Sequence, residues 1–171
     1  MAVINYLRIS LLSAWIGTAI YFSAVVAPNV FGVLRSFGLT NANEIAGTIV
    51  TRTLSVVNIS GFILGLLLLI LTLALRKRYG KPSFVVQLVL MIIVAGATGL
   101  GEWVIAARMR LLRAAMHGQI DQVAPTDPTH MAFAALHGYS VAALGTAMMA
   151  AILVILLMIS SRGKEIPFLK K

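Results

Sequence analysis

The chain has 171 residues, 60% of them hydrophobic, and a mean hydropathy of +0.96. Soluble domains contain roughly 45–50% apolar residues, so this composition excludes a soluble globular protein and indicates one membrane-embedded domain, 1–171. The net charge of +9 gathers in short clusters beside apolar runs, which predicts contact with anionic lipids at the cytoplasmic face rather than with nucleic acid. Because cysteine is absent, disulfides, thiolate metal sites and cysteine nucleophiles are excluded.

Four apolar runs, 3–27, 54–75, 84–107 and 136–159, are long enough to cross a bilayer, which takes about 20 helical residues. Each run is expected to be helical, because lipid offers the backbone no hydrogen-bond partner. The first run resembles a signal peptide, but its length and Pro28 directly after its small residues favour an uncleaved helix. The sequence therefore predicts an all-α, integral membrane four-helix bundle.

The orientation of the bundle is predicted from lysine and arginine. The segment 76–82 holds four basic residues, the tail after residue 161 holds another four, and the N-terminus adds Arg8. Five basic residues fall on the opposite side: Arg35, Arg52, Arg108, Arg110 and Arg113. The positive-inside rule then predicts a multi-pass protein of the cell membrane with both termini cytoplasmic.

The first connection is expected to lie at the membrane surface. Pro28 is predicted to end or kink the first helix. Apolar residues spaced at three in segment 28–37 predict an interfacial helix lying on the membrane. Asn43 is predicted to cap a helix that starts at Glu44 and could run on into the second span.

The third and fourth helices are predicted to be longer than the membrane requires. The third keeps helical composition as far as Gly118, a plausible C-cap, and Asp127 followed by Pro128 is typical of a helix start. Each helix would then have about 34 residues, or roughly 51 Å, against an apolar core of roughly 30 Å. We therefore expect both to project beyond the outer face.

Polar residues can be placed by depth, because antiparallel neighbours carry residues equidistant from a turn at equal height. The residues that share a layer at the outer interface on this count are Pro28, Arg52, Arg108 and His137. Glu102 falls about six residues deeper, level with Asn58 and Ser23, inside the apolar slab. A charge there costs on the order of 3 kcal/mol if unpaired, so Glu102 is expected to face the bundle and meet Arg52, Arg108 or His137, with Asn58 and Ser23 alongside.

Two interpretations of this predicted polar cluster stay open. Its members are Glu102, Arg52, Arg108, Arg113, His137 and Asn58. In the first interpretation, the cluster is a structural network that holds the helices in register. In the second, it lines an outward-open pocket for an anionic or metal-bearing solute, with Glu102 carrying a proton or a cation.

Other chemistries have weaker support. His117 and His130 could approach one another near the outer loop and, with nearby methionines, are weak candidates for a metal site. A haem needs two facing histidines, and only His137 lies near a span, so no cofactor is predicted. The sequence contains no Ser–His–Asp order, nucleotide loop or paired carboxylates. A non-enzymatic protein is therefore favoured.

A resemblance to a known family rests on the order of several short motifs. They are Trp15-x-Gly17, Phe22, Val25-Val26-Ala27-Pro28, Phe31, Leu34, Ala46-Gly47, Arg108-Met109-Arg110-x-x-Arg113-Ala114-Ala115-Met116, Asp127-Pro128 and Phe133-x-x-Leu136-His137-Gly138-Tyr139-Ser140. In this order they resemble the family catalogued as domain of unknown function 4149, whose eukaryotic relatives form the transmembrane protein 205 group. The resemblance covers residues 15–140 and includes the family's positions Pro28, Arg108, Arg113, His137 and Ser140.

The resemblance implies four transmembrane helices and no established reaction. The eukaryotic members are linked with drug and metal-drug resistance, which implies export or trafficking. Those relatives tend to carry an aromatic–proline pair where this chain has Arg52-Thr53-Leu54, and that departure weakens the transfer of eukaryotic function.

Three hypotheses of function follow. The first is a solute-handling or export-related protein that works as a homo-oligomer. The second is an accessory subunit of a larger membrane complex, packed through its glycine- and alanine-rich helices. The third is a haem- or quinone-binding membrane protein. Gly61 and Gly65 form a GxxxG motif, for which internal helix packing is favoured over a homodimer face.

Overall fold

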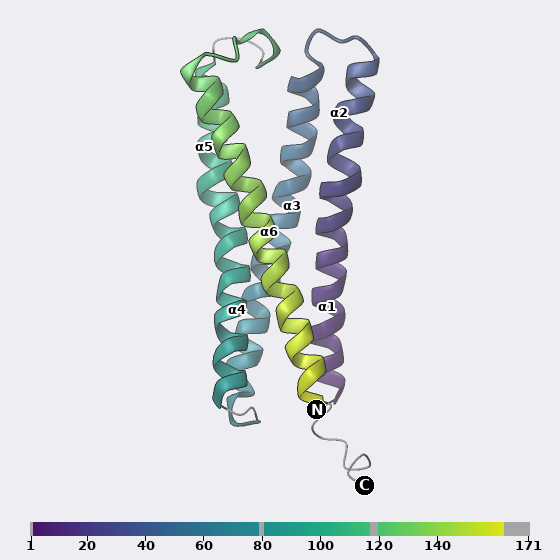
Figure 1. The fold of residues 1–171 in the computed structure, drawn as a ribbon, viewed down its shortest axis with the longest axis vertical. Coiled ribbons are helices and arrows are strands. Elements are labelled where there is room, and N and C mark those ends of the chain that lie inside the picture. Colours follow the sequence, from purple (N-terminus) through teal and green to yellow (C-terminus); the bar gives the residue numbers. More distant parts are fainter. Residues whose placement is uncertain (1, 79–80, 117–119, 163–171) are drawn as a thin grey trace.

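The structure, a computed structural model, describes residues 2–78, 81–116 and 120–162. Its elements are α1 (Ala2–Tyr21), the π-helix η1 (Phe22–Val26), α2 (Ala27–Ser36), α3 (Ala42–Ala74), the 3-10 turn η2 (Arg76–Arg78), α4 (Lys81–Gly99), the π-helix η3 (Leu100–Ala106), α5 (Ala107–Ala115), the 3-10 turn η4 (Ile120–Gln122) and α6 (Pro128–Arg162). They form four long antiparallel rods: α1–η1–α2, α3, α4–η3–α5 and α6 (Figure 1).

The two ends of the bundle differ in what they contain. The end where α1 begins and α6 stops also holds the α3–α4 connection, and we call it the terminal end (Figure 1). The opposite end, the loop end, holds the α2–α3 and α5–α6 connections. Each rod is long and apolar enough to cross a membrane. The chain is therefore an all-α, multi-pass integral membrane protein, as predicted, whereas the cytoplasmic position of the termini stays a prediction.

The first rod corrects the predicted interfacial helix. α2 continues along the axis of α1 and packs against α3 instead of turning onto the membrane surface (Figure 1). Proline lacks an N–H group and its ring clashes with the carbonyl four residues earlier. The π-helix η1 just before Pro28, in which the Ala27 N–H bonds to the Phe22 carbonyl five residues back, widens the helix at this point and accommodates the ring. The rod therefore passes through Pro28 unbroken.

The start of α3 differs from the prediction by two residues. The helix begins at Ala42, and the Asn43 side chain does not cap it, because Asn43 Oδ1 accepts a hydrogen bond of 2.8 Å from Arg35 Nε. The turn before it uses Gly38, whose φ of 66° is readily adopted only by glycine. Glu44 lies in the first turn, and the helix continues without interruption to the end of the second span, both as predicted.

The outer parts of the last two rods agree with the sequence where the structure describes them. Asp127 Oδ1 accepts hydrogen bonds from the backbone N–H groups of Thr129 (2.7 Å) and His130 (3.3 Å), which confirms the cap before Pro128. α6 has 35 residues, about 52 Å at 1.5 Å per residue. α5 ends at Ala115, and the predicted C-cap Gly118 lies outside the described residues. Projection of these rods beyond the membrane stays a prediction.

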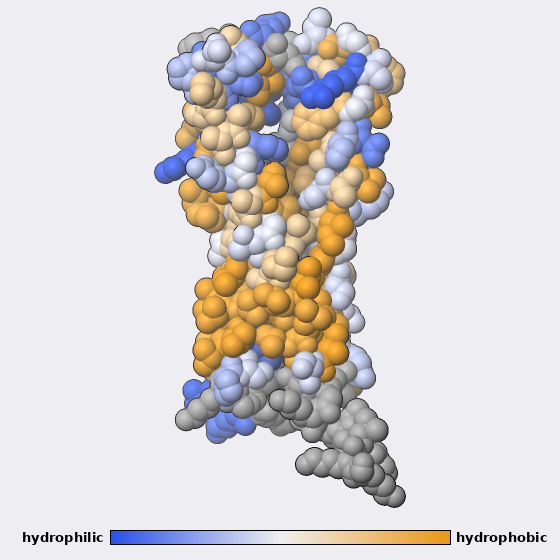
Figure 2. All heavy atoms as spheres, in the orientation of Figure 1, coloured by the Kyte–Doolittle hydropathy of each residue, from blue (hydrophilic) through white to orange (hydrophobic). Residues whose placement is uncertain are grey.

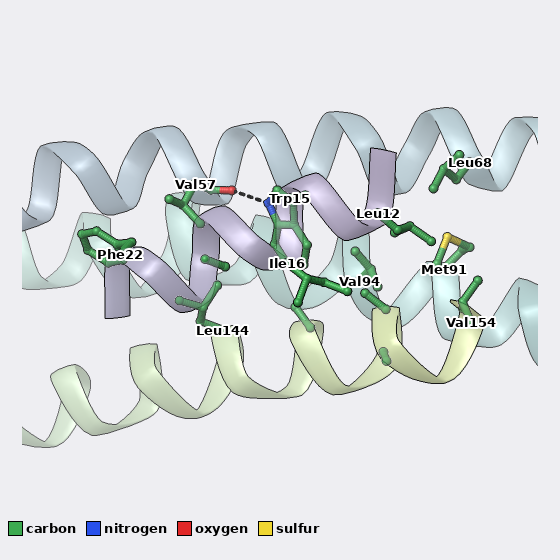
Figure 3. Packing of buried hydrophobic residues seen from close by; sticks show 14 of the residues in the cluster. Leu12, Trp15, Ile16, Phe22, Val57, Leu68, Met91, Val94, Leu144 and Val154 are labelled. Atoms are coloured by element: carbon green, nitrogen blue, oxygen red, sulfur yellow. Dashed lines mark hydrogen bonds between the residues drawn. The ribbon is translucent and has the colours of Figure 1, made fainter. Parts of the chain in front are cut away.

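Two glycines let helices approach closely in the core. Trp15 Nε1 donates a hydrogen bond of 3.0 Å to the Val57 carbonyl, and its ring lies so close to α3 that a Cβ at Gly61 would come within 2.6 Å of it (Figure 3). A Cβ at Gly65 would lie 3.0 Å from the backbone of Ala95. Both glycines of the GxxxG motif therefore serve internal packing, as predicted.

The surface divides along the same long axis. On the face shown in Figure 2, apolar side chains form a continuous belt in the half nearer the terminal end, whereas polar and apolar side chains mix in the half nearer the loop end. The polar groups of the candidate site described next belong to this second half.

Candidate functional site

A change of neighbours along α6 creates a cavity. Near the terminal end α6 packs against α1, and toward the loop end it leaves the first rod and packs against η3 and α5 (Figure 1). The space that opens between η1–α2, α3 and α6 is a cavity of about 420 Å³. This volume lies within the range of small-molecule sites, about 300–1,000 Å³.

The wall of the cavity is mostly apolar. Its lining residues are Phe22, Ser23, Ala27, Pro28 and Phe31 from the first rod, Val50 and Leu54 from α3, and His137, Ser140, Val141, Leu144, Gly145 and Met148 from α6. Polar side chains among them come from Ser23, His137 and Ser140. The last two lie three residues apart on α6, so they share one face of that helix. The cavity thus combines a large apolar wall with one small polar patch.

Ser140 differs from several threonines in the helices in the hydrogen bonding of its hydroxyl group. Thr72, Thr98 and Thr146 each donate a hydrogen bond of 2.7–2.9 Å to the carbonyl four residues earlier. Ser140 is only 6% exposed, and its hydroxyl makes no hydrogen bond within residues 2–78, 81–116 and 120–162. Because Ser140 also lines the cavity, its hydroxyl is available to a ligand.

A second polar site is built on the π-helix η3. It places Glu102 inside the bundle, 6% exposed, where Oε1 accepts a hydrogen bond of 2.9 Å from Ser55 Oγ. Arg110 Nη1 lies 3.7 Å from the same oxygen. The other oxygen, Oε2, is buried and has no hydrogen-bond partner among the described residues. Asn58, 3% exposed, packs against Gly101, where a Cβ would be 3.2 Å from Asn58 Nδ2.

The structure therefore brings together part of the predicted cluster. Glu102 and Asn58 are buried on facing elements, consistent with their equal depth. Arg52, Arg108 and His137 are exposed, and among the described residues none of them makes an ion pair or hydrogen bond with Glu102. His137 belongs to the wall of the cavity instead.

Arg110, which pairs with Glu102, was not predicted as its partner. Eight residues separate them, and in an uninterrupted α-helix this spacing turns two side chains about 80° apart. The additional residue in the wide turns of η3 brings Arg110 back toward the face of Glu102. Hydrophobic periodicity did not reveal the π-helix, so it could not reveal this pair.

The histidines considered for a metal site do not form one where they are described. His130 is half-buried near the start of α6, and His117 lies outside the described residues. In the part of the chain that the structure covers, no three His, Cys, Asp or Glu side chains gather in a way that could hold a metal ion.

Comparison with known families places the chain. The family described as "Domain of unknown function (DUF4149)" matches residues 10–118, more than half of the sequence. The chain belongs to the DUF4149 family. The resemblance noted from the short motifs is thereby confirmed, although its motifs after residue 118, including His137 and Ser140, lie beyond the matched range. No curated protein and no solved structure matches the chain.

The DUF4149 range also contains Arg113, whose contacts are structural. Arg113 Nε lies 3.6 Å from Glu44 Oε1, and its guanidinium stands over the ring of Phe133 at 5.4 Å from the centroid. Gly47 leaves room for this side chain, because a Cβ there would lie 2.6 Å from Arg113 Nη2. Arg113 thus ties α3, α5 and α6 together at the loop end.

Sequence reasoning missed a buried arginine at the other end of this DUF4149 bundle. Arg8 was counted only as a positive charge beside the first span, yet it is 0% exposed. Its Nη2 donates hydrogen bonds to Thr72 Oγ1 (2.6 Å) and Gln87 Oε1 (3.4 Å), which links α1 to α3 and α4. Its position four and seven residues before the core residues Leu12 and Trp15 was the signal that could have revealed it.

Proposed function

We propose that this DUF4149 protein handles a small, largely apolar solute that carries one hydrogen-bonding group, and that it binds this solute in the cavity between α2, α3 and α6. The observation that carries the proposal is the hydroxyl of Ser140, a residue only 6% exposed, without a hydrogen-bond partner in the described structure, in the wall of an apolar cavity of about 420 Å³.

The chemistry of the wall selects the solute class. Apolar surface removed from water stabilises by roughly 25 cal/mol per Å², and aromatic side chains such as Phe22 and Phe31 supply much of that surface here. The polar patch offers a hydroxyl and an imidazole, which suit an alcohol, carbonyl or amine. No arginine or carboxylate belongs to the lining residues, and this favours an amphipathic solute over the anionic or metal-bearing one suggested by the sequence.

The position of the cavity favours access from the bilayer. Pro28 on α2 and Val141 on α6 both line it and are both exposed, on the two helices that separate toward the loop end. In a membrane, an exposed apolar side chain at this height faces lipid. A solute already dissolved in the bilayer could therefore enter sideways, as handling or export of an amphipathic compound requires.

Photolabelling tests the site. The protein, reconstituted in phosphatidylcholine vesicles, is irradiated with a long-chain alcohol that bears a diazirine on its alkyl chain, and labelled residues are mapped by mass spectrometry. We expect labels to concentrate on Phe31 and Met148. Gly145→Phe should abolish this labelling, because Gly145 lines the cavity and a Cβ there meets nothing within 4 Å, so the ring can fill the space.

A matched variant controls for the added ring. Gly96→Phe places the same side chain on α4 at an exposed position where a Cβ also meets nothing within 4 Å, and it should leave the labelling intact. Labels spread evenly over lipid-facing residues, or cavity labels unchanged by Gly145→Phe, would contradict the proposal.

The hydroxyl is tested separately with Ser140→Ala. Loss of one hydrogen bond, about 1 kcal/mol, should weaken labelling by the diazirine alcohol about fivefold. Labelling by the corresponding diazirine alkane, which has no hydroxyl, should not change. Equal effects on the two probes would show that Ser140 does not recognise the polar group.

A further inference from the structure

We infer that Glu102 is a proton-binding site, which takes up a proton at Oε2 and releases it again. This site lies on η3, apart from the lining of the solute cavity, and the inference does not depend on the proposed solute.

The two carboxylate oxygens of Glu102 have unequal environments. Oε1 has Ser55 as hydrogen-bond donor, whereas Oε2 is buried with no partner among the described residues. Burying a charged oxygen without a compensating hydrogen bond costs free energy that protonation removes. Within an apolar span the same carboxylate is favourable only when it is neutralised or paired.

The ion pair between Arg110 and Glu102 is weak. Arg110 Nη1 stands 3.7 Å from Oε1, beyond hydrogen-bond distance, and the Arg110 side chain is 55% exposed against 8% for Glu102. Ion pairs with an exposed partner contribute about 0–1 kcal/mol. Arg110 can therefore turn into water when Glu102 becomes neutral, and the pair stabilises the ionised form of Glu102 only weakly.

The pair at the loop end provides the contrast. Glu44 and Arg113 have side chains that are only 28% and 24% exposed, and Arg113 is also held over Phe133 and hydrogen-bonded to Thr48 Oγ1 at 3.4 Å. Both carboxylates thus face an arginine on α5, but only in the Glu44 pair is that arginine fixed by other contacts. Glu44 is the matched control for Glu102.

The Ser55 hydroxyl can hydrogen-bond to Glu102 in both of its protonation states. A hydroxyl can donate to Oε1 whether this atom belongs to a carboxylate or is the carbonyl oxygen of a carboxylic acid. In the proposed step, hydronium from the aqueous phase transfers its proton to Oε2 and becomes water, and the carboxylate becomes a neutral acid. The reverse step returns the proton to water, and the Ser55 hydrogen bond persists throughout.

Other charged or titratable groups on the packed elements are few. They are Glu44 and Arg52 on α3, Arg108, Arg110 and Arg113 on α5, and His130, His137 and Tyr139 on α6 between Pro128 and Ser160; α4 has none from Pro82 to Gly99. Of these, Arg110 is the group in the described structure that forms an ion pair with Glu102. We therefore expect its removal to have the largest effect on proton binding.

Infrared spectroscopy tests the inference without any solute. The full chain contains only five Asp and Glu residues, so the carbonyl stretch of a protonated carboxyl group can be followed against pH in phosphatidylcholine vesicles. We expect a band from Glu102 that disappears reversibly as pH rises. It should be absent in Glu102→Gln and present in Glu44→Gln. A wild-type spectrum identical to that of Glu102→Gln at every pH overturns the inference.

Two further variants keep the test decisive if Glu102→Gln does not fold. Arg110→Gln should extend the band to higher pH, because the ionised form loses its cation, whereas Arg113→Gln should leave its pH dependence unchanged. Glu102→Asp should keep a titrating band at a shifted frequency. Equal responses to Arg110→Gln and Arg113→Gln would also overturn the inference.

Discussion

The terminal half and the loop half of the bundle differ in how closely the helices pack around their buried polar groups. In the terminal half the helices meet closely at Gly61 and Gly65, and Arg8 has hydrogen-bond partners on two neighbouring helices. In the loop half α6 leaves the first rod, a cavity opens, and the Ser140 hydroxyl and one oxygen of Glu102 have no hydrogen-bond partner in the described structure. The proposed solute cavity and the proposed proton site both lie in the second half, whereas the close helix contacts lie in the first.

The largest effect on stability is expected from removal of the buried arginine of the terminal half. Arg8→Ala takes two charged hydrogen bonds from Thr72 and Gln87 and leaves a space among buried residues. Hydrogen bonds to charged groups contribute about 1.5–3 kcal/mol each, so we expect a loss of about 3 kcal/mol or more in thermal unfolding in detergent. Arg52→Ala, at an exposed site, should change stability by less than about 0.5 kcal/mol. Similar losses for the two variants would contradict the assignment of Arg8.

A matched pair of glycine substitutions should give opposite signs in the two halves. Gly61→Ala forces a methyl group to within 2.6 Å of Trp15 and should destabilise by about 1–3 kcal/mol. Gly145→Ala, in the cavity wall with nothing within 4 Å, should stabilise slightly, by about 0.5–1 kcal/mol, because alanine favours the helix. The comparison of melting temperatures measures both, and equal shifts would mean that the halves are packed alike.

A smaller difference in stability is expected between substitutions of the buried Trp15 and of an exposed tryptophan. Trp15→Phe retains an aromatic ring but removes the donor to the Val57 carbonyl, at an expected cost of about 1 kcal/mol. Trp103, which is 53% exposed and stacks edge-on against Phe62, is the control. Trp103→Phe should have a smaller effect on the melting temperature. A larger effect than that of Trp15→Phe would mean that the exposed tryptophan contributes more to stability than the buried one.

The smallest effect is expected at the start of α6. Hydrogen bonds from Thr129 lower the pKa of Asp127 below its ordinary value of 3.8. The ionised cap therefore contributes stability above that pH, and the contribution is lost as pH falls through the lower folded value. After correction for the intrinsic slowing of exchange in acid, the protection of the Thr129 and His130 amides should fall on acidification in the wild type. In Asp127→Asn, which can still cap but cannot ionise, this pH dependence should be absent.

Much of the fold could be predicted because bilayer thickness and hydrogen-bond chemistry act locally. A run of about 20 apolar residues must be a helix in lipid, and Asp127 before Pro128 starts one wherever the chain goes next. The cap predicted at Asn43 failed because a residue outside its helix, Arg35, binds that side chain. The interfacial helix failed because a π-helix lets the rod continue through Pro28.

From the sequence alone we could predict four apolar helices, their approximate limits, the family, and an equal depth for Glu102 and Asn58. The tertiary structure decided which polar groups are paired. The π-helix η3 turned Arg110 toward Glu102, and the face shared with Leu12 and Trp15 buried Arg8. The divergence of α6 from α2 placed His137 and Ser140 in a cavity wall. Such pairings depend on helix rotation and tilt, which are set by packing between rods that are distant in the chain.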